Sequence, residues 1–287
     1  MGDDASNRMG PARSRGGLKR GIYVLPSLFT VGTLVCGYIA VLSTLQAIAF
    51  VDNTYSQASF DLAARAIGWA ILFDGLDGRI ARMTNASSNF GREFDSLADV
   101  ITFGLAPAFL AFAWGVRSVA AGALSDQLVR LGWIVTFAYV ICGAARLARF
   151  NIDKGATSDR RYFIGLPIPG AAGVIASVVH FYQFPITEVI YGVMWLVTVA
   201  ALAFLMVSRV RYFSFKTLDL RRRRPYVTII LIGSIVFGIW AFSRPVLLTM
   251  AVVYMFSGPL GRLAGRLPPQ PPAPKREDSH GPEAHPA

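Results

Sequence analysis

The chain has 287 residues, of which 54% are hydrophobic and only 16% are charged. Soluble globular domains carry about 25% charged residues, so this composition argues against a soluble domain and favours a membrane protein. The two cysteines, Cys36 and Cys142, lie in apolar runs, which excludes a disulfide framework and a cysteine-rich metal site. The net charge of +11 makes nucleic-acid binding a class to test.

Both ends of the chain are polar and are predicted to be disordered. Residues 1–21 are basic and Gly-rich, and they lack the apolar core of a signal peptide. Residues 266–287 are rich in Pro and nearly devoid of large apolar side chains. One polytopic membrane domain is therefore expected over 22–265.

The middle of the chain predicts an all-α bundle of about eight transmembrane helices. About 20 apolar residues cross a ~30 Å hydrocarbon core. Spans are expected at about 22–48, 60–80, 92–116, 129–149, 165–183, 187–208, 226–243 and 245–263. The second has only a short purely apolar stretch, and a Ser-Arg-Pro turn alone separates the last two. Six or seven spans therefore remain alternatives.

The distribution of Lys and Arg predicts the orientation of the bundle. With eight spans, both termini lie on one side of the membrane. The same side then holds all of the 28 Lys and Arg except Arg65, Arg117, Arg130 and Arg244. The positive-inside rule makes this side cytoplasmic. Topology and attraction to anionic lipid thus explain the positive charge, and nucleic acid is not expected as a partner.

Acidic residues gather where the second and third expected spans meet the cytoplasm. Asp74 and Asp77 are three residues apart and Asp95 and Asp99 are four apart, so each pair presents one helical face. A short loop joins the two antiparallel helices, so the pairs are expected to converge. A single acid at a helix end would need no functional explanation, but ionisable groups inside membrane segments are functional by default.

Carboxylates packed this closely require either protonation or bound cations. Hard oxygen ligands suit Mg²⁺, Mn²⁺ or Ca²⁺, whereas zinc would need His or Cys nearby. Two divalent cations would balance two pairs of carboxylates, and two metals also clamp the attacking and leaving oxygens of a displacement. His180 is interpreted as a lone polar residue near the outer end of its span. Glu93 is interpreted as a structural acid at a helix start.

Small residues and an arginine lie between the two acidic pairs. Gly78 and Ala81 lie on or beside the face of the first pair and would let a bulky ligand approach the backbone. Arg82 follows one turn later, where a guanidinium can bind phosphate bidentately. Gly91, near the start of the next helix, allows another close approach. This combination favours a ligand that carries a pyrophosphate.

The stretch resembles the signature of the CDP-alcohol phosphotransferase family in every fixed position, namely Asp74-x2-Asp77-Gly78-x2-Ala81-Arg82-x8-Gly91-x3-Asp95-x3-Asp99. The resemblance implies an integral membrane enzyme, usually a homodimer, that transfers a phosphatidyl or similar group from a CDP-linked donor to an alcohol and releases CMP. It implies two Mg²⁺ or Mn²⁺ ions held by Asp74, Asp77, Asp95 and Asp99, with Asp99 also acting as general base. The residues implied to face the cytidine diphosphate are Gly78, Ala81, Arg82, Ser88 and Gly91.

Further segments resemble the branch of this family that uses serine as the acceptor. They are 95–107, 146–151, 165–169, 205–208 and 214–216. The resemblance covers about 22–225, and it implies CDP-diacylglycerol and L-serine as substrates, contact with membrane lipid, and a bacterial inner membrane. Ser27 and Thr33 stand where the family often has Asn, so no contact is carried over for these two residues.

The residues themselves leave the acceptor open. A zwitterionic amino acid needs a cation for its carboxylate, and Arg146 and Arg149 are candidates, although both also fit the positive-inside pattern. Glycerol phosphate, inositol phosphate and choline remain alternative acceptors. A divalent-metal transporter is a remote alternative, because it would need polar residues through the bilayer and the acids here cluster at one face. A structural anchor without enzymatic activity is a third alternative function.

Overall fold

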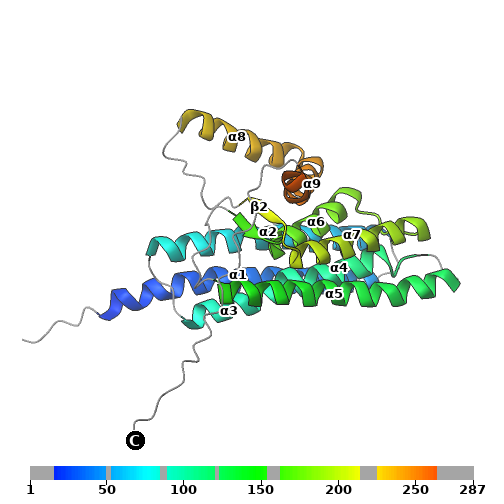
Figure 1. Cartoon of the computed structure of the whole chain (residues 1–287), viewed down its shortest axis with the longest axis horizontal. Coiled ribbons are helices and arrows are strands. Elements are labelled where there is room, and N and C mark those ends of the chain that lie inside the picture. Colours follow the sequence, from blue (N-terminus) through cyan, green and yellow to red (C-terminus); the bar gives the residue numbers. More distant parts are fainter. Residues whose placement is uncertain are drawn as a thin grey trace, which may run out of the picture.

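Long helices running side by side make up most of the described part of the chain (Figure 1). The computed structural model describes residues 16–49, 53–84, 89–119, 123–153, 162–213 and 225–263. The predicted C-terminal tail lies outside these ranges. The first helix begins at Gly16, within the stretch that the sequence predicts to be disordered.

The helices follow the order of the apolar runs in the sequence. They are α1 (Gly16–Ala49), α2 (Asn53–Thr84), α3 (Asn89–Asp99), α4 (Ala106–Gly115), α5 (Ala123–Asp153), α6 (Ile168–Tyr182), α7 (Val189–Val207), α8 (Pro225–Ala241) and α9 (Ser243–Leu263). A π-helical turn, η1 (Val100–Leu105), joins α3 to α4. The three segments therefore form one continuous helical path.

Small side chains allow α1 and α2 to pack closely along their length. Ala40 and Ala47 of α1 and Ala63 and Ala70 of α2 are all buried. Within a membrane, where lipid tails are as apolar as leucine, such small residues let helix backbones approach and gain van der Waals contact. The pair fixes the position of α2, whose C-terminal part carries the first acidic pair.

The short helix α6 lies in the core of the bundle, against α2 and α9. Its Ile175 and Val179 are fully buried. On another side of the bundle, Trp195 of α7 donates a hydrogen bond from Nε1 to the carbonyl oxygen of Ala111, at 2.9 Å. A Cβ on Gly115 would lie 2.0 Å from the same indole ring, so this glycine makes room for the α4–α7 contact.

In the part of the chain that the structure describes, two short strands lie among the helices. β1 (Tyr162–Ile164) and β2 (Arg211–Phe213) pair antiparallel, with Phe163 opposite Tyr212. Gly165 follows β1 at a φ of +79°, and a Cβ there would lie 2.3 Å from the carbonyl oxygen of Met206. Only glycine fits this turn, which leads from the strand into α6.

The structure confirms an all-α membrane protein with this one small ladder added. Among the described residues, four stretches are long and apolar enough to cross a membrane, namely Leu28–Ala49, Phe90–Gly115, Asp126–Ile152 and Val189–Val207. Helices also occupy the other expected spans, but α2 carries several charged residues and α6 is short. Eight transmembrane helices and cytoplasmic termini therefore stay a prediction.

Candidate active site where α2 and α3 converge

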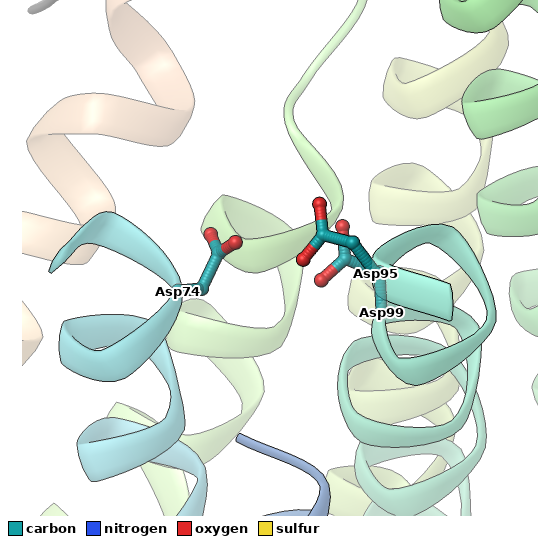
Figure 2. Close-up of side chains that lie close together, drawn as sticks. All are labelled: Asp74, Asp95 and Asp99. Atoms are coloured by element: carbon teal, nitrogen blue, oxygen red, sulfur yellow. The ribbon is translucent and has the colours of Figure 1, made fainter. Parts of the chain in front are cut away.

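Three aspartates from two helices meet in one cluster. Asp74 projects from α2 toward Asp95 and Asp99 of α3, and the three carboxyl groups point toward one another (Figure 2). One carboxylate oxygen from each lies within 4.8 Å of the others. The convergence predicted from the spacing of the acidic pairs is therefore present for these three residues.

The position of α3 depends on contacts with α5 and α1. Asn151 of α5 donates a hydrogen bond from Nδ2 to Oγ of Ser96 at 3.0 Å, directly beside Asp95. After Asp99 the helix widens into η1, and π-helical turns of this kind are frequent at functional sites. Within η1, Thr102 donates to the carbonyl oxygen of Thr33 on α1 at 3.3 Å. α3 is thus held on two sides.

Asp77 is positioned differently from the other three aspartates. It is buried, and the hydroxyl of Thr30 on α1 donates a hydrogen bond to its Oδ2 at 2.5 Å. Its Oδ1 is buried without a hydrogen-bond partner among the described residues. The carboxylate of Asp77 still interacts electrostatically with Asp99, so Asp77 lies near the cluster of the other three aspartates. Its role as a metal ligand stays a prediction.

The charges around Asp99 are those of a cation site. The carboxylates of Asp74, Asp95 and Asp77 all act on it, and Arg146 opposes them. The Oδ1 of Asp99 is buried and has no hydrogen-bond partner within the described ranges. Clustered carboxylates with unused buried oxygens match the hard oxygen ligands that Mg²⁺ and Mn²⁺ prefer, so these residues fit a divalent cation.

The residues expected to face the cytidine diphosphate are only partly described. Gly78 follows Asp77 on α2 and is half-buried, and Gly91 is half-buried near the start of α3. Ala81 and Arg82 belong to the last part of α2, without described side chains, and Ser88 lies outside the described residues. The structure therefore brings the two glycines to the ends of the helices that carry the aspartates.

The two candidate arginines differ in their surroundings. Arg146 of α5 is half-buried and acts electrostatically on Asp99. Its Nε is buried and has no hydrogen-bond partner in the part of the chain that the structure describes. Arg149, one turn later, is exposed. Arg146 is the better candidate for a group that contacts a substrate.

Sequence reasoning missed two residues at this site. Thr30 was not selected, although a buried threonine on an apolar helix needs a polar partner and here finds Asp77. Tyr254 of α9 was also missed, and it lies within electrostatic range of Arg146. Thr33 donates to the carbonyl oxygen of Phe29 in its own helix at 3.1 Å, and the side chain of Ser27 is not described.

The interpretation of His180 as a lone polar residue is wrong. Its Nδ1 hydrogen-bonds to Oδ1 of Asp61 at 2.5 Å, and its Nε2 lies 3.1 Å from Oγ of Ser243. Arg65 adds a salt bridge to Asp61 at 3.0 Å. The helix α2 carries Asp61 about 13 residues before Asp74, which is roughly 20 Å away. This cluster is therefore separate from the three aspartates.

Comparison with known proteins points to phosphatidyl transfer. Residues 23–207 match the family model described as CDP-alcohol phosphatidyltransferase. The CDP-diacylglycerol–serine O-phosphatidyltransferase of Helicobacter pylori (strain ATCC 700392 / 26695) is 36% identical over 75% of this chain and 82% of its own length. The protein of the same name from Bacillus subtilis (strain 168) is 35% identical over 67% of this chain and 91% of its own length.

Proposed function

The chain belongs to the CDP-alcohol phosphatidyltransferase family, and from this premise we propose that it makes phosphatidylserine and CMP from CDP-diacylglycerol and L-serine. The observation that carries the proposal is the cluster of Asp74, Asp95 and Asp99, formed by the segment that the family model covers. The two relatives bear the same name, and this chain covers 82% and 91% of their lengths. Their name supports serine as the acceptor.

Asp74, Asp77, Asp95 and Asp99 are proposed to hold two divalent ions, Mg²⁺ or Mn²⁺. When bound, such ions supply positive charge to the phosphates and to the departing CMP. Asp99 accepts the proton of the acceptor hydroxyl, because it lies further along α3 than Asp95 and its buried Oδ1 has no hydrogen-bond partner among the described residues. The hydroxyl oxygen then forms a bond to the phosphorus that bears diacylglycerol, and the bond from this phosphorus to CMP breaks.

The nucleotide side of the site is proposed to lie at the ends of α2 and α3. Gly78, Ala81 and Gly91 would let the pyrophosphate approach the backbone, and Arg82 would bind a phosphate oxygen. Ser88, in the connection between the two helices, is included from the family pattern. The donor's acyl chains remain in lipid while its head group binds between α2 and α3.

The acceptor side is proposed to centre on α5. Arg146 interacts electrostatically with Asp99, and its guanidinium would hold the carboxylate of serine while the serine hydroxyl faces the base. Arg149 is a second candidate, at the exposed rim of the same helix. This division assigns Asp99 to the hydroxyl of serine and Arg146 to its carboxylate.

The surroundings of the site follow from the same reasoning. We expect a transmembrane domain over 22–265 with eight spans and a disordered tail at 266–287, while the predicted N-terminal tail at 1–21 already includes the first residues of α1, from Gly16 onward. The positive-inside rule places both termini and the active site on the cytoplasmic side of a bacterial inner membrane. A homodimer in contact with membrane lipid is expected from the family.

CMP release by the purified protein tests this function. CDP-diacylglycerol and Mg²⁺ or Mn²⁺ are supplied in detergent, with serine, glycerol 3-phosphate, an inositol phosphate or choline as the acceptor. We expect release that requires serine and is abolished by a chelator. Release that requires another alcohol would keep the family and overturn serine as the acceptor.

The variant Asp99→Asn separates chemistry from folding. A general base contributes about 10²- to 10⁴-fold, so activity should fall at least about a hundredfold, and further if a metal ligand is lost as well. Asp126→Asn is the matched control, because Asp126 is exposed near the start of α5. Equal activity of the two variants would contradict the role of Asp99. Metal uptake by folded protein without CMP release from any acceptor would favour a transporter.

A further inference from the structure

The last described helix, α9, lies outside the region that the family model matches, and it packs beside α6 and β2 (Figure 1). We propose that Tyr254 of α9 is an acceptor-binding residue, whose hydroxyl holds the acceptor's carboxylate together with Arg146. This inference rests on the proposed function and deepens it by naming a residue that sets acceptor specificity.

The β1–β2 ladder fixes α9 in place. Tyr212 of β2 is fully buried, and its hydroxyl donates a hydrogen bond to the carbonyl oxygen of Met255 on α9 at 3.1 Å. A Cβ on Gly258 would lie 2.6 Å from the Tyr212 ring, so the ring lies directly against the backbone of α9. A hydrogen bond and close packing against Tyr212 therefore fix the position of α9 along the bundle.

The ring of Tyr254 is held between two neighbours. Its centroid lies 5.8 Å from that of Tyr212, with the rings tilted by 47°. On α6, a Cβ on Gly170 would lie 2.9 Å from the Tyr254 ring, so the ring covers this glycine. A half-buried ring in such surroundings has few alternative rotamers, and the direction of its hydroxyl is largely fixed.

Three helices contribute polar groups to the proposed acceptor site, namely Tyr254 of α9, Arg146 of α5 and Asp99 of α3. Arg146 of α5 is near enough to Tyr254 of α9 and to Asp99 of α3 to interact with each electrostatically. The buried Nε of Arg146 has no hydrogen-bond partner among described residues, and buried polar groups without a partner point to a missing ligand. The three helices thus supply a base at one end and two carboxylate-binding groups at the other.

A base at one end and carboxylate-binding groups at the other match the chemistry of serine. Its hydroxyl and its carboxylate are separated by two carbon atoms, so one molecule can present the hydroxyl to Asp99 and the carboxylate to Arg146 and Tyr254. A phenol hydroxyl donates one hydrogen bond to a carboxylate oxygen, and hydrogen bonds to charged groups are the stronger kind. An alcohol without a carboxylate would accept at most a weaker, uncharged hydrogen bond from Tyr254.

The test compares wild type with Tyr254→Phe, which keeps the ring and removes only the hydroxyl. KM for L-serine should rise about tenfold, the factor expected for one hydrogen bond to a charged group, while kcat changes less than about twofold. L-Serinamide, which lacks the carboxylate, is measured both as an acceptor and as an inhibitor of the serine reaction. Its amide oxygen accepts only a weaker, uncharged hydrogen bond, so its kinetic constants should change less than those of serine, and the preference for serine over serinamide should fall about threefold or more.

Tyr182→Phe is the matched control, because Tyr182 is exposed at the C-terminal end of α6 and packs on Phe181. A merely structural role of Tyr254 would weaken serine and serinamide equally, and that result would overturn the inference. An unchanged KM for serine in Tyr254→Phe would also overturn it. If wild type releases no CMP with serine, the proposed function itself fails, and this is visible without any variant.

Discussion

Thr30 donates a hydrogen bond to Asp77 from a neighbouring helix, and this contact determines how one carboxylate of the site is oriented. Residues that hydrogen-bond to metal-binding carboxylates fix their direction, and removing them commonly costs 10- to 100-fold in metal affinity. Thr30→Val keeps the shape of the side chain and removes the donor. We expect the Mg²⁺ or Mn²⁺ concentration for half-maximal CMP release to rise about tenfold.

Thr44→Val is the control for this prediction. Thr44 is buried on the same helix, but its hydroxyl donates to the carbonyl oxygen of Ala40 at 2.7 Å, within α1. The variant Thr44→Val therefore loses a threonine hydrogen bond, but no aspartate loses a partner. Identical metal dependence of Thr30→Val and wild type would show that Thr30 does not orient a ligand.

At the scale of the elements, α1 and η1 approach each other more closely than ordinary helices do. A Cβ on Gly37 would lie 2.6 Å from Oγ1 of Thr102 and 2.9 Å from its Cα, so backbone as well as side chain would have to move. Gly37→Ala should therefore push η1 away from α1, and with it the end of α3 that carries Asp99. Overpacking of this kind costs about 1–3 kcal/mol.

Thermal unfolding in detergent and CMP release measure the two consequences of Gly37→Ala. The apparent free energy of unfolding should fall by about 1–3 kcal/mol, and activity should fall at a temperature where the variant is still folded. Gly68→Ala is the control, because a Cβ on this helical glycine meets nothing within 4 Å. That change should be neutral or stabilising by up to about 1 kcal/mol. Equal stability of the two variants would contradict the close approach.

The helices and the aspartate cluster were predictable because both depend on local sequence. Apolar runs determine where the helices form, and three- and four-residue spacings place each acidic pair on one face. The contact of Thr30 with Asp77 joins residues 47 positions apart, and that of His180 with Asp61 joins residues 119 positions apart. Such contacts depend on how helices pack, so one sequence without relatives does not reveal them.

The π-helical turn and the strands were missed for a similar reason. The segment 100–105 is apolar and reads as ordinary helix, and only packing against α1 and α5 favours the wider turn. Its widened backbone leaves the carbonyl oxygen of Phe103 to accept a hydrogen bond from the buried Tyr139 at 3.1 Å. β1 and β2 are three residues each, too short for an alternating pattern to stand out.

At the scale of the whole molecule, polar groups gather at the two opposite ends of α2. The aspartate cluster occupies one end, and the second cluster, made of Asp61, His180 and Ser243, occupies the other. The second cluster joins α2, α6 and α9, so it holds the N-terminal end of α9 while the Tyr212 contacts hold the part that carries Tyr254. The helix α2 therefore carries a structural polar cluster in its first half and the proposed chemistry in its second half.

Because Asp61 and His180 are both buried, removing either one takes a buried hydrogen bond from the other, which keeps only its contact with Arg65 or Ser243. We expect His180→Ala and Asp61→Asn each to lower the apparent free energy of unfolding by about 1–3 kcal/mol. The double variant should cost clearly less than the sum, since the interaction can be lost only once. Fully additive losses would contradict a direct coupling. Activity at a temperature where all variants are folded should stay within about threefold of wild type, because the cluster lies roughly 20 Å from the aspartates.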